Sequence, residues 1–279
     1  MRIRATVAAV SGALALSALA VPAATAADEP SAPNLSPFVA NAPSAAGASD
    51  TKVTKVVVNG GKDIVVGTTK TKFVKVAVTL TDPDGIKDSI GFLWHGSDFE
   101  TKIDGAITPP DGVQDADCVK ADETTSTCTI EIIANPKDNI YGNVLAGKWK
   151  VAVGAVDGQD NEFFVENFQS HSVKRAAKLT TNASPEPVKK GKTLTVTGAL
   201  TRANWDTSKY AGYTKQDVKL QYKKKGTSSY TTLKTVKSDT KGNLKTTVTA
   251  SADGYYRYVF AGTSTTPAVT STSDFVDVQ

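Results

Sequence analysis

The sequence is poor in the residues that most often build metal centres and nucleophilic active sites. It contains two cysteines, two histidines and one methionine in 279 residues. Two thiols need further ligands to hold a metal such as zinc, and the chain offers only His95 and His171. Neither histidine lies near a nucleophile motif such as G-x-S-x-G. We therefore expect no catalytic residues and no enzyme activity.

Long apolar runs are also absent, except at the N-terminus. The run from Val7 to Val21 is shorter than the roughly 20 residues that a membrane span needs. It follows Arg2 and Arg4 and precedes the A-x-A cleavage pattern Ala24-Thr25-Ala26. This order is typical of a secretory signal peptide, which we place at residues 1–26. The sequence therefore predicts a secreted, extracellular protein with no membrane anchor.

Composition and charge divide the rest of the chain. Residues 27–50 are rich in Ala, Pro and Ser, which predicts a disordered leader. Residues 28–175 hold 21 acidic and 14 basic side chains, whereas residues 176–279 hold 7 acidic and 16 basic ones. The change from net −7 to net +9 predicts an acidic domain at 51–176 and a basic domain at 177–279. The alternative is that the solvent-exposed surfaces of the two halves differ in net charge by chance, without a functional reason.

Apolar residues recur with period two, and no window after the signal peptide has a helical period. "KFVKVAVTLT", "CTIEII" and "WKVAVGA" all alternate between apolar and polar residues, as half-buried strands do. The first domain is expected to hold strands near 51–58, 63–66, 71–81, 86–95, 127–133, 148–156 and 162–174. The second is expected to hold strands near 193–200, 217–225, 229–237, 243–250, 255–262 and 271–278. The predicted fold is all-β, with two antiparallel β-sandwiches in tandem.

Cys118 and Cys128 lie close together in "DCVKADETTSTC". In an oxidising compartment such a pair predicts one disulfide that closes a short loop. A bond of this kind contributes about 2–3 kcal/mol in the chain-entropy model.

Two acidic loops each follow a predicted strand, "DPDGIKD" at 82–88 and "DGQDN" at 157–161. Their oxygen-bearing side chains are the candidate ligands of a calcium ion: Asp82, Asp84, Asp88, Asp157, Asp160 and Asn161. A loop-end site of this type would be weak, with a dissociation constant on the order of 10⁻⁴–10⁻³ M. The alternative is a plain turn, because Asp82-Pro83-Asp84-Gly85 matches the residue preferences of a type I turn.

Lys219, Lys223 and Lys225 alternate along one predicted strand, so they are expected to point the same way. The row could bind an anionic cell-wall polymer through salt-sensitive contacts. Lysine at a sheet edge also protects against aggregation, which is the alternative interpretation. Trp94 in "GFLWHG" could stack on a sugar, although a buried tryptophan is more common in a sandwich.

The second domain resembles the bacterial immunoglobulin-like or fibronectin-like domains of secreted Gram-positive proteins. The likeness is carried by "PVKKGKTLTVTGAL", "DVKLQYKKKGTSSYTTLKTVKSDTKGNLKTTV" and "GYYRYVFAG". The whole chain is similar to small exported proteins of high-GC Gram-positive bacteria that are sometimes called calcium-binding. In its first domain the segment "AGKWKVAVGAVDGQDN" supports this similarity, because it resembles the G-x-W/Y…D-x-x-G-N ending of many bacterial immunoglobulin-like domains. Asp160 stands where that ending has its last Gly. The resemblance implies tandem immunoglobulin/fibronectin-like sandwiches.

Together these features predict a secreted, non-enzymatic binding or structural protein, extracellular or associated with the cell wall, with a weak Ca²⁺ site in its first domain. The alternative is a secreted carbohydrate-binding module or an accessory module of a hydrolytic enzyme. The expected partner is an anionic cell-wall polymer or another surface protein, and the chain is expected to be a monomer. Nucleic acid is not expected as a partner.

Overall fold

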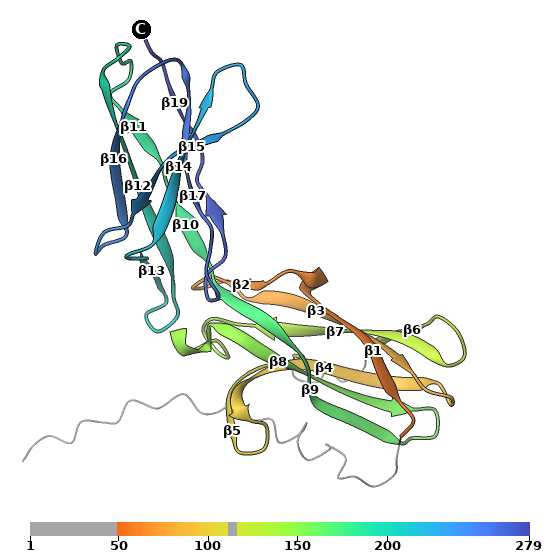
Figure 1. Cartoon of the computed structure of the whole chain (residues 1–279). Helices are drawn as coiled ribbons and strands as arrows, with labels where there is room; N and C mark the ends of the chain where they lie inside the picture. Colours follow the sequence, from red (N-terminus) through yellow and green to blue (C-terminus); the bar gives the residue numbers. More distant parts are fainter. Residues whose placement is uncertain (1–48, 111–115) are drawn as a thin grey trace, which may run out of the picture. The chain divides into compact units, whose positions relative to one another are not determined.

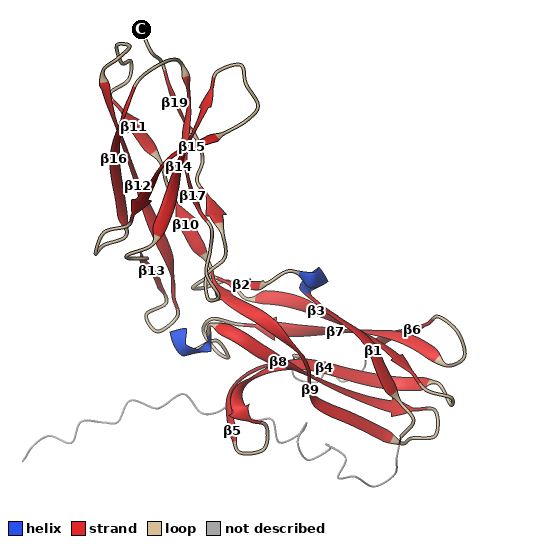
Figure 2. Ribbon diagram, in the orientation of Figure 1, coloured by secondary structure: helices blue, strands red, loops and turns tan. Residues whose placement is uncertain are grey.

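The computed structural model describes residues 49–110 and 116–279, and nearly all regular structure there is β (Figure 2). The helical segments within these ranges are two 3₁₀ turns, η1 (Asn59–Gly61) and η2 (Asn143–Leu145). The prediction of an all-β fold is confirmed. No helix in these ranges has the length and apolar character required to cross a membrane. The predicted signal peptide and nearly all of the predicted leader lie outside the described residues.

The first sandwich is formed by strands between residues 52 and 175 (Figure 1). These strands are β1 (Lys52–Val58), β2 (Ile64–Val66), β3 (Lys72–Thr81), β4 (Ile86–Asp98), β5 (Lys102–Ile107), β6 (Asp117–Lys120), β7 (Thr125–Ala134), β8 (Gly147–Asp157) and β9 (Glu162–Arg175). One sheet has the order β1-β3-β7-β6, and the other has the order β2-β9-β8-β4-β5. All neighbours are antiparallel except β2 and β9, which are parallel.

This strand order is that of an immunoglobulin domain. If β1, β3, β4, β6, β7, β8 and β9 are lettered A, B, C, D, E, F and G, one sheet reads A-B-E-D and the other contains G-F-C. The predicted immunoglobulin-like sandwich therefore follows from the pairing of this chain's own strands.

The core of the first sandwich is built from the residues that alternate in the sequence. On β3, Val74, Val76, Val78 and Leu80 are all at most 1 % exposed. From the facing sheet, β8 contributes Trp149, whose side chain is fully buried and whose Nε1 donates a hydrogen bond to the Leu145 carbonyl at 2.7 Å. The alternating pattern therefore identified the inward faces of these strands correctly.

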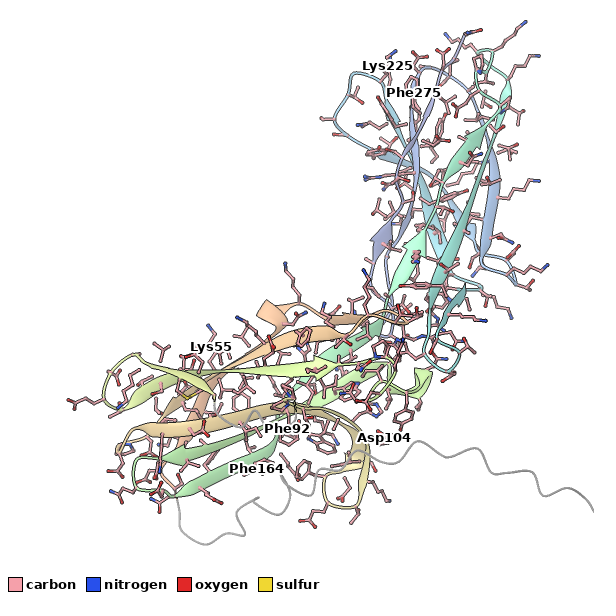
Figure 3. The ribbon with its side chains drawn as sticks, turned by 180° about the vertical axis from the view of Figure 1, so that it is seen from behind. Lys55, Phe92, Asp104, Phe164, Lys225 and Phe275 are labelled. Carbon is pink, nitrogen blue, oxygen red and sulfur yellow. A yellow bond between two sulfur atoms is a disulfide. The ribbon has the colours of Figure 1, made fainter. Side chains whose placement is uncertain are left out.

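A second apolar cluster lies on the other face of β4 and β8. Its buried members are Phe92, Trp94, Phe99 and Ala152. The ring of Phe92 lies 6.4 Å from that of Phe164 on β9, and both side chains are labelled in Figure 3. Trp94 is 1 % exposed and donates a hydrogen bond from Nε1 to the Glu166 carbonyl at 2.6 Å. The favoured interpretation of Trp94 as a buried tryptophan is therefore confirmed, and its ring is not available to stack on a sugar.

The predicted disulfide is present. Cys118 on β6 and Cys128 on β7 are directly opposite each other in the antiparallel pair and are bonded. In antibody domains the disulfide links the two sheets, whereas here it joins neighbouring strands of one sheet.

The second sandwich is formed by strands between residues 177 and 276 (Figure 1). These strands are β10 (Ala177–Leu179), β11 (Asn182–Ser184), β12 (Thr193–Asn204), β13 (Lys209–Gly212), β14 (Asp217–Lys224), β15 (Thr231–Lys237), β16 (Asn243–Thr249), β17 (Gly254–Phe260), β18 (Val269–Thr270) and β19 (Asp274–Val276). In one sheet β12 pairs with β10, β11, β13 and β16. The other sheet has the order β15-β14-β17-β18, and β19 also pairs with β17.

Alternate residues of β14 and β17 form much of the second core. Val218 and Leu220 on β14 are fully buried, and Tyr256, Tyr258 and Phe260 on β17 are at most 3 % exposed. The Tyr258 hydroxyl donates to the Val196 carbonyl of the facing sheet at 3.0 Å, and burial raises its pKa to about 12. The residues between these positions on β14 and β17 consequently point away from the core.

Candidate functional site

The two acidic loops of the first sandwich lie against each other. The turn at 82–85 connects β3 in one sheet to β4 in the other, and β4 pairs with β8. In that antiparallel pair Ile86, at the start of β4, is opposite Asp157, at the end of β8. The backbone amide of Gly158 donates to the Gly85 carbonyl at 3.0 Å. The pairing of β4 with β8 therefore brings together two segments that are about 75 residues apart in the sequence.

Three carboxylates meet at this point. One oxygen from each of Asp82, Asp84 and Asp157 lies within 4.8 Å of the other two. Asp82 and Asp157 are only 2 % exposed, whereas Asp84 is exposed. Within the described ranges no lysine, arginine or histidine nitrogen forms an ion pair with any of the three. Like charges at this distance repel each other, and solvent at the exposed Asp84 screens part of the repulsion.

Asp82 shapes the first loop. Its Oδ1 accepts the backbone N–H of Asp84 at 2.9 Å, and its Oδ2 accepts the hydroxyl of Thr51 at 2.8 Å. The Gly85 N–H donates to the Asp82 carbonyl at 3.0 Å, which is the closing hydrogen bond of a β-turn. The predicted turn is therefore present, and it directs Asp84 toward the other two carboxylates. The turn and the proposed ion site are compatible with each other.

Asp157 organises the second loop. Its Oδ1 accepts the backbone N–H groups of Gln159 and Asn161, both at 2.8 Å, and its Oδ2 accepts the Asn161 side-chain amide at 2.9 Å. Burial raises the pKa of Asp157, but the hydrogen bonds from Asn161 and Gln159 outweigh it, so the pKa is lowered. The loop therefore holds this carboxylate in its charged form.

A glycine is required where the loops touch. A Cβ added to Gly158 would lie 2.1 Å from the Asp84 carbonyl oxygen, which is far inside van der Waals contact. Any larger residue at this position would push the two loops apart. Gly158, in the Asp157-Gly158 pair, therefore allows the two loops to approach closely as well as allowing a turn.

The other three predicted ligands have different partners. The Asp88 carboxylate accepts the backbone N–H groups of Ser89 and Ala116, at 2.7 and 3.1 Å. Asp160 forms an exposed ion pair with Lys87, and Asn161 donates its side-chain amide to Asp157. The structure thus brings together three of the six candidate side chains, with Asn161 adjacent to them.

Neither histidine is part of a nucleophilic set. The Nδ1 of His95 lies 2.5 Å from a carboxylate oxygen of Asp104, on the neighbouring strand β5. The Nε2 of His171 lies 3.1 Å from the Lys62 carbonyl, and burial lowers the pKa of this histidine. Among the described residues, no hydroxyl or thiol is hydrogen-bonded to either imidazole. His95 and Asp104 form a pair that the sequence did not reveal, because the two residues lie on opposite strands of a hairpin.

The predicted lysine row lies on the outer face of the second sandwich. Lys219 and Lys223 are opposite Val259 and Tyr255 of β17, on the side of β14 that faces away from the core. Lys225 follows the end of β14, and its ammonium group lies 3.2 Å from an Asp253 carboxylate oxygen. Two of the three lysines therefore share a strand face, and the charge of the third is paired.

Comparisons with known proteins find distant structural matches. No protein-family model matches the chain, and no curated protein matches it. The fibronectin(III)-like modules of CbhA from Clostridium thermocellum are 10 % identical, with 80 % of this chain and 93 % of that chain covered and a TM-score of 0.31.

Two other solved structures are similarly distant. The D00-D0 domain of intimin is 12 % identical over 80 % of this chain and 99 % of that one, with a TM-score of 0.26. The ectodomain of the teleost fish polymeric Ig receptor is 13 % identical over 78 % of this chain and 95 % of that one, with a TM-score of 0.23. At these identities and TM-scores, no function can be transferred to this chain.

Proposed function

We propose that this chain is an exported, non-catalytic binding or structural protein that acts outside the cell or at the cell wall. Three features support this function. The N-terminal sequence has the pattern of a secretory signal peptide, the Cys118–Cys128 disulfide is of the kind that persists in oxidising compartments, and both sandwiches are built on an architecture common in extracellular proteins. The resemblance to exported proteins of Gram-positive bacteria leads to the same proposal.

The specific activity that we propose for the first sandwich is weak calcium binding. The observation that carries it is the meeting of Asp82, Asp84 and Asp157, whose negative charges have no cationic partner in the described part of the chain. Calcium takes six to eight oxygen ligands, and three carboxylates supply between three and six, so water would complete the shell. A divalent cation at this point would also relieve the repulsion between the carboxylates. Partial coordination by water fits a dissociation constant on the order of 10⁻⁴–10⁻³ M.

Titration with calcium chloride is expected to produce a binding heat and to raise the melting temperature of the first sandwich. At a calcium concentration ten times the dissociation constant, the expected stabilisation is about 1.4 kcal/mol. The Asp84→Ala variant should lose this response with little change in its stability without calcium, because this side chain is exposed. Asp160→Asn is the matched control, since Asp160 belongs to the same acidic loops but pairs with Lys87, and asparagine tolerates the φ of 64° at this position. An Asp84→Ala variant that responds like the wild type would refute the site.

A second candidate activity is the binding of an anionic cell-wall polymer by the basic sandwich. It is favoured by the shared outward face of Lys219 and Lys223, on a strand whose inward face is buried. The reversal of Lys219, Lys223 and Lys225 to Glu is expected to abolish sedimentation of the full chain with purified cell walls at low salt. The wild-type interaction should weaken steeply as salt is added. Undiminished sedimentation of the reversed variant would mean that these lysines only solvate the surface.

A further inference from the structure

The outer face of the sheet around β14 and β17 carries aromatic and cationic side chains in alternation. Alternate residues of β14 and β17 point into the core, so the residues between them point outward. The inward-pointing residues include Val218, Leu220, Tyr256 and Tyr258. In the antiparallel register Lys223 is opposite Tyr255, and Gln221 is opposite Arg257. Phe275 of β19 is opposite Tyr255 on its other side, and Tyr230 lies immediately before β15. We call this surface the aromatic–cationic face; its residues are Gln221, Lys223, Tyr230, Tyr255, Arg257 and Phe275.

The side chains of this face hold one another in place. The Lys223 ammonium lies 4.8 Å from the ring centre of Tyr255 and 5.2 Å from that of Tyr230. The Arg257 guanidinium lies 3.6 Å from the ring centre of Tyr230, and its Nε donates to the Gln221 side-chain carbonyl at 2.9 Å. These contacts fix two cations in position before any ligand arrives, which lowers the entropy cost of binding.

The charges of Lys223 and Arg257 are not neutralised. Neither has a carboxylate oxygen within 4.0 Å among the described residues, in contrast to Lys225 with Asp253 and Lys237 with Asp217. Their partners are aromatic rings and one amide, and all of these are uncharged. A stacked arginine still presents its N–H groups to a planar carboxylate. The face therefore holds two ordered positive charges that can bind an anion.

The aromatic rings add a second kind of recognition. The rings of Tyr255 and Phe275 are 5.1 Å apart and are both partly exposed. The face continues to Lys225, whose ammonium lies 5.4 Å from the ring centre of Phe275, and both residues are labelled at the same end of this sandwich in Figure 3. Beside it lies a hollow lined partly by Lys190, Lys224 and Lys225. Apolar rings and cations thus extend together along an open sheet surface.

We propose that the aromatic–cationic face binds an acidic polysaccharide. The C–H faces of its sugar rings would pack on Tyr255 and Phe275, and its carboxylates would pair with Lys223 and Arg257. An open strand surface fits an extended polymer better than a small molecule, which usually needs a concave site. A polyphosphate would use the cations but leave the aromatic rings without a contact. The inference rests on the second candidate activity above and gives that activity a class of ligand.

The test compares four polymers on the full chain: polygalacturonate, dextran, polyphosphate and a single-stranded oligonucleotide. Polygalacturonate should bind most tightly and dextran least. Tyr255→Ala should weaken polygalacturonate binding about tenfold, which corresponds to about 1.4 kcal/mol, and should change polyphosphate binding less than twofold. Lys223→Ala should weaken both. Lys245→Ala is the control, because Lys245 is exposed on β16 of the other sheet.

The outcomes separate the inference from the function on which it rests. If Tyr255→Ala binds polygalacturonate as well as the wild type does, the sugar-stacking inference fails. If polyphosphate binding is nevertheless salt-sensitive and is weakened by Lys223→Ala, the proposed binding of anionic polymers is still supported. Binding of none of the polymers would overturn both, and tighter binding of the oligonucleotide would identify a different class of partner and overturn the inference. Thermal melting of each variant shows whether a loss of binding reflects a loss of folding, and Tyr255→Phe, which keeps the ring, should bind like the wild type.

Discussion

The Asp157→Ala variant is expected to lose the calcium response and to be about 1–3 kcal/mol less stable than the wild type without calcium. The substitution leaves the N–H groups of Gln159 and Asn161, and the Asn161 side-chain amide, without their acceptor. A hydrogen bond to a charged group contributes about 1.5–3 kcal/mol, and water at the exposed Gln159 and Asn161 together with relief of the repulsion with Asp82 and Asp84 offsets part of the loss. Urea unfolding with and without calcium measures both effects.

The same variant is expected to change the acid sensitivity of the first sandwich. The pKa of Asp157 is lower in the folded protein than its ordinary value near 3.8. Its charged form therefore stabilises the fold above that value, and this stabilisation is lost as the pH falls through the lowered folded pKa. Asp157→Ala should lose less stability than the wild type below about pH 4. Asp160→Asn should behave like the wild type in both experiments, because asparagine tolerates the left-handed backbone of this position and exposed ion pairs such as Asp160 with Lys87 contribute about 0–1 kcal/mol. Equal losses in the two variants would contradict the special role of Asp157.

Replacement of Trp149 by alanine is expected to have the largest effect of any single substitution considered, a loss of about 3–5 kcal/mol. The indole is fully buried in the core of the first sandwich and also donates a hydrogen bond to the Leu145 carbonyl. A loss of this size is a large part of the 5–15 kcal/mol that typically stabilises a whole protein. Since Trp149 lies on β8, which ends at Asp157, the variant should also weaken calcium binding by loosening that strand.

Phe73→Ala is the matched control for the tryptophan. Phe73 is an aromatic residue on β3 of the same sandwich, but it is 60 % exposed. Its removal should change the free energy of unfolding by no more than about 0.5 kcal/mol. Urea unfolding followed by circular dichroism distinguishes the two variants. If Trp149→Ala unfolded at the same urea concentration as Phe73→Ala, the position of the core would have been assigned incorrectly.

The period-two pattern predicted the long strands because each has one buried and one solvated face. It predicted the short edge strands β5, β6 and β13 poorly, since strands of four to six residues at an edge have little alternation to detect. It also gave no sign of the cluster around Phe92 and Trp94. β4 is apolar on both faces over this stretch, and a continuous apolar run does not reveal how its two faces are covered.

The candidate calcium site was only partly predictable. The two loops could be found in the sequence, but their contact depends on the pairing of β4 with β8 and on its register. An irregularity between Ile86 and Asp88 shifts that register, so Asp88 accepts hydrogen bonds from Ser89 and Ala116. No local pattern indicates such a bulge.

The surroundings of the lysine row were also only partly predictable from the sequence. Alternation along β14 placed Lys219 and Lys223 on one face, but the two rings around Lys223, those of Tyr230 and Tyr255, come from two other segments of the chain. Tyr230, Tyr255 and Phe275 become neighbours only through the order β15-β14-β17 and the pairing of β19 with β17. Lys225 lies past the strand end, where the alternation no longer applies and Asp253 is within reach.

The most direct test of the calcium proposal is a calcium titration followed in the amide NMR spectrum of the isotope-labelled chain. We expect shifts at millimolar calcium that are confined to the two loops, at residues 82–88 and 157–161, and that saturate with one dissociation constant for both loops. Asp84→Ala should remove the shifts from both loops together, because the two loops would share one ion. Unchanged loop resonances at 10 mM calcium, or shifts that scatter over exposed carboxylates elsewhere, would contradict a site made by Asp82, Asp84 and Asp157.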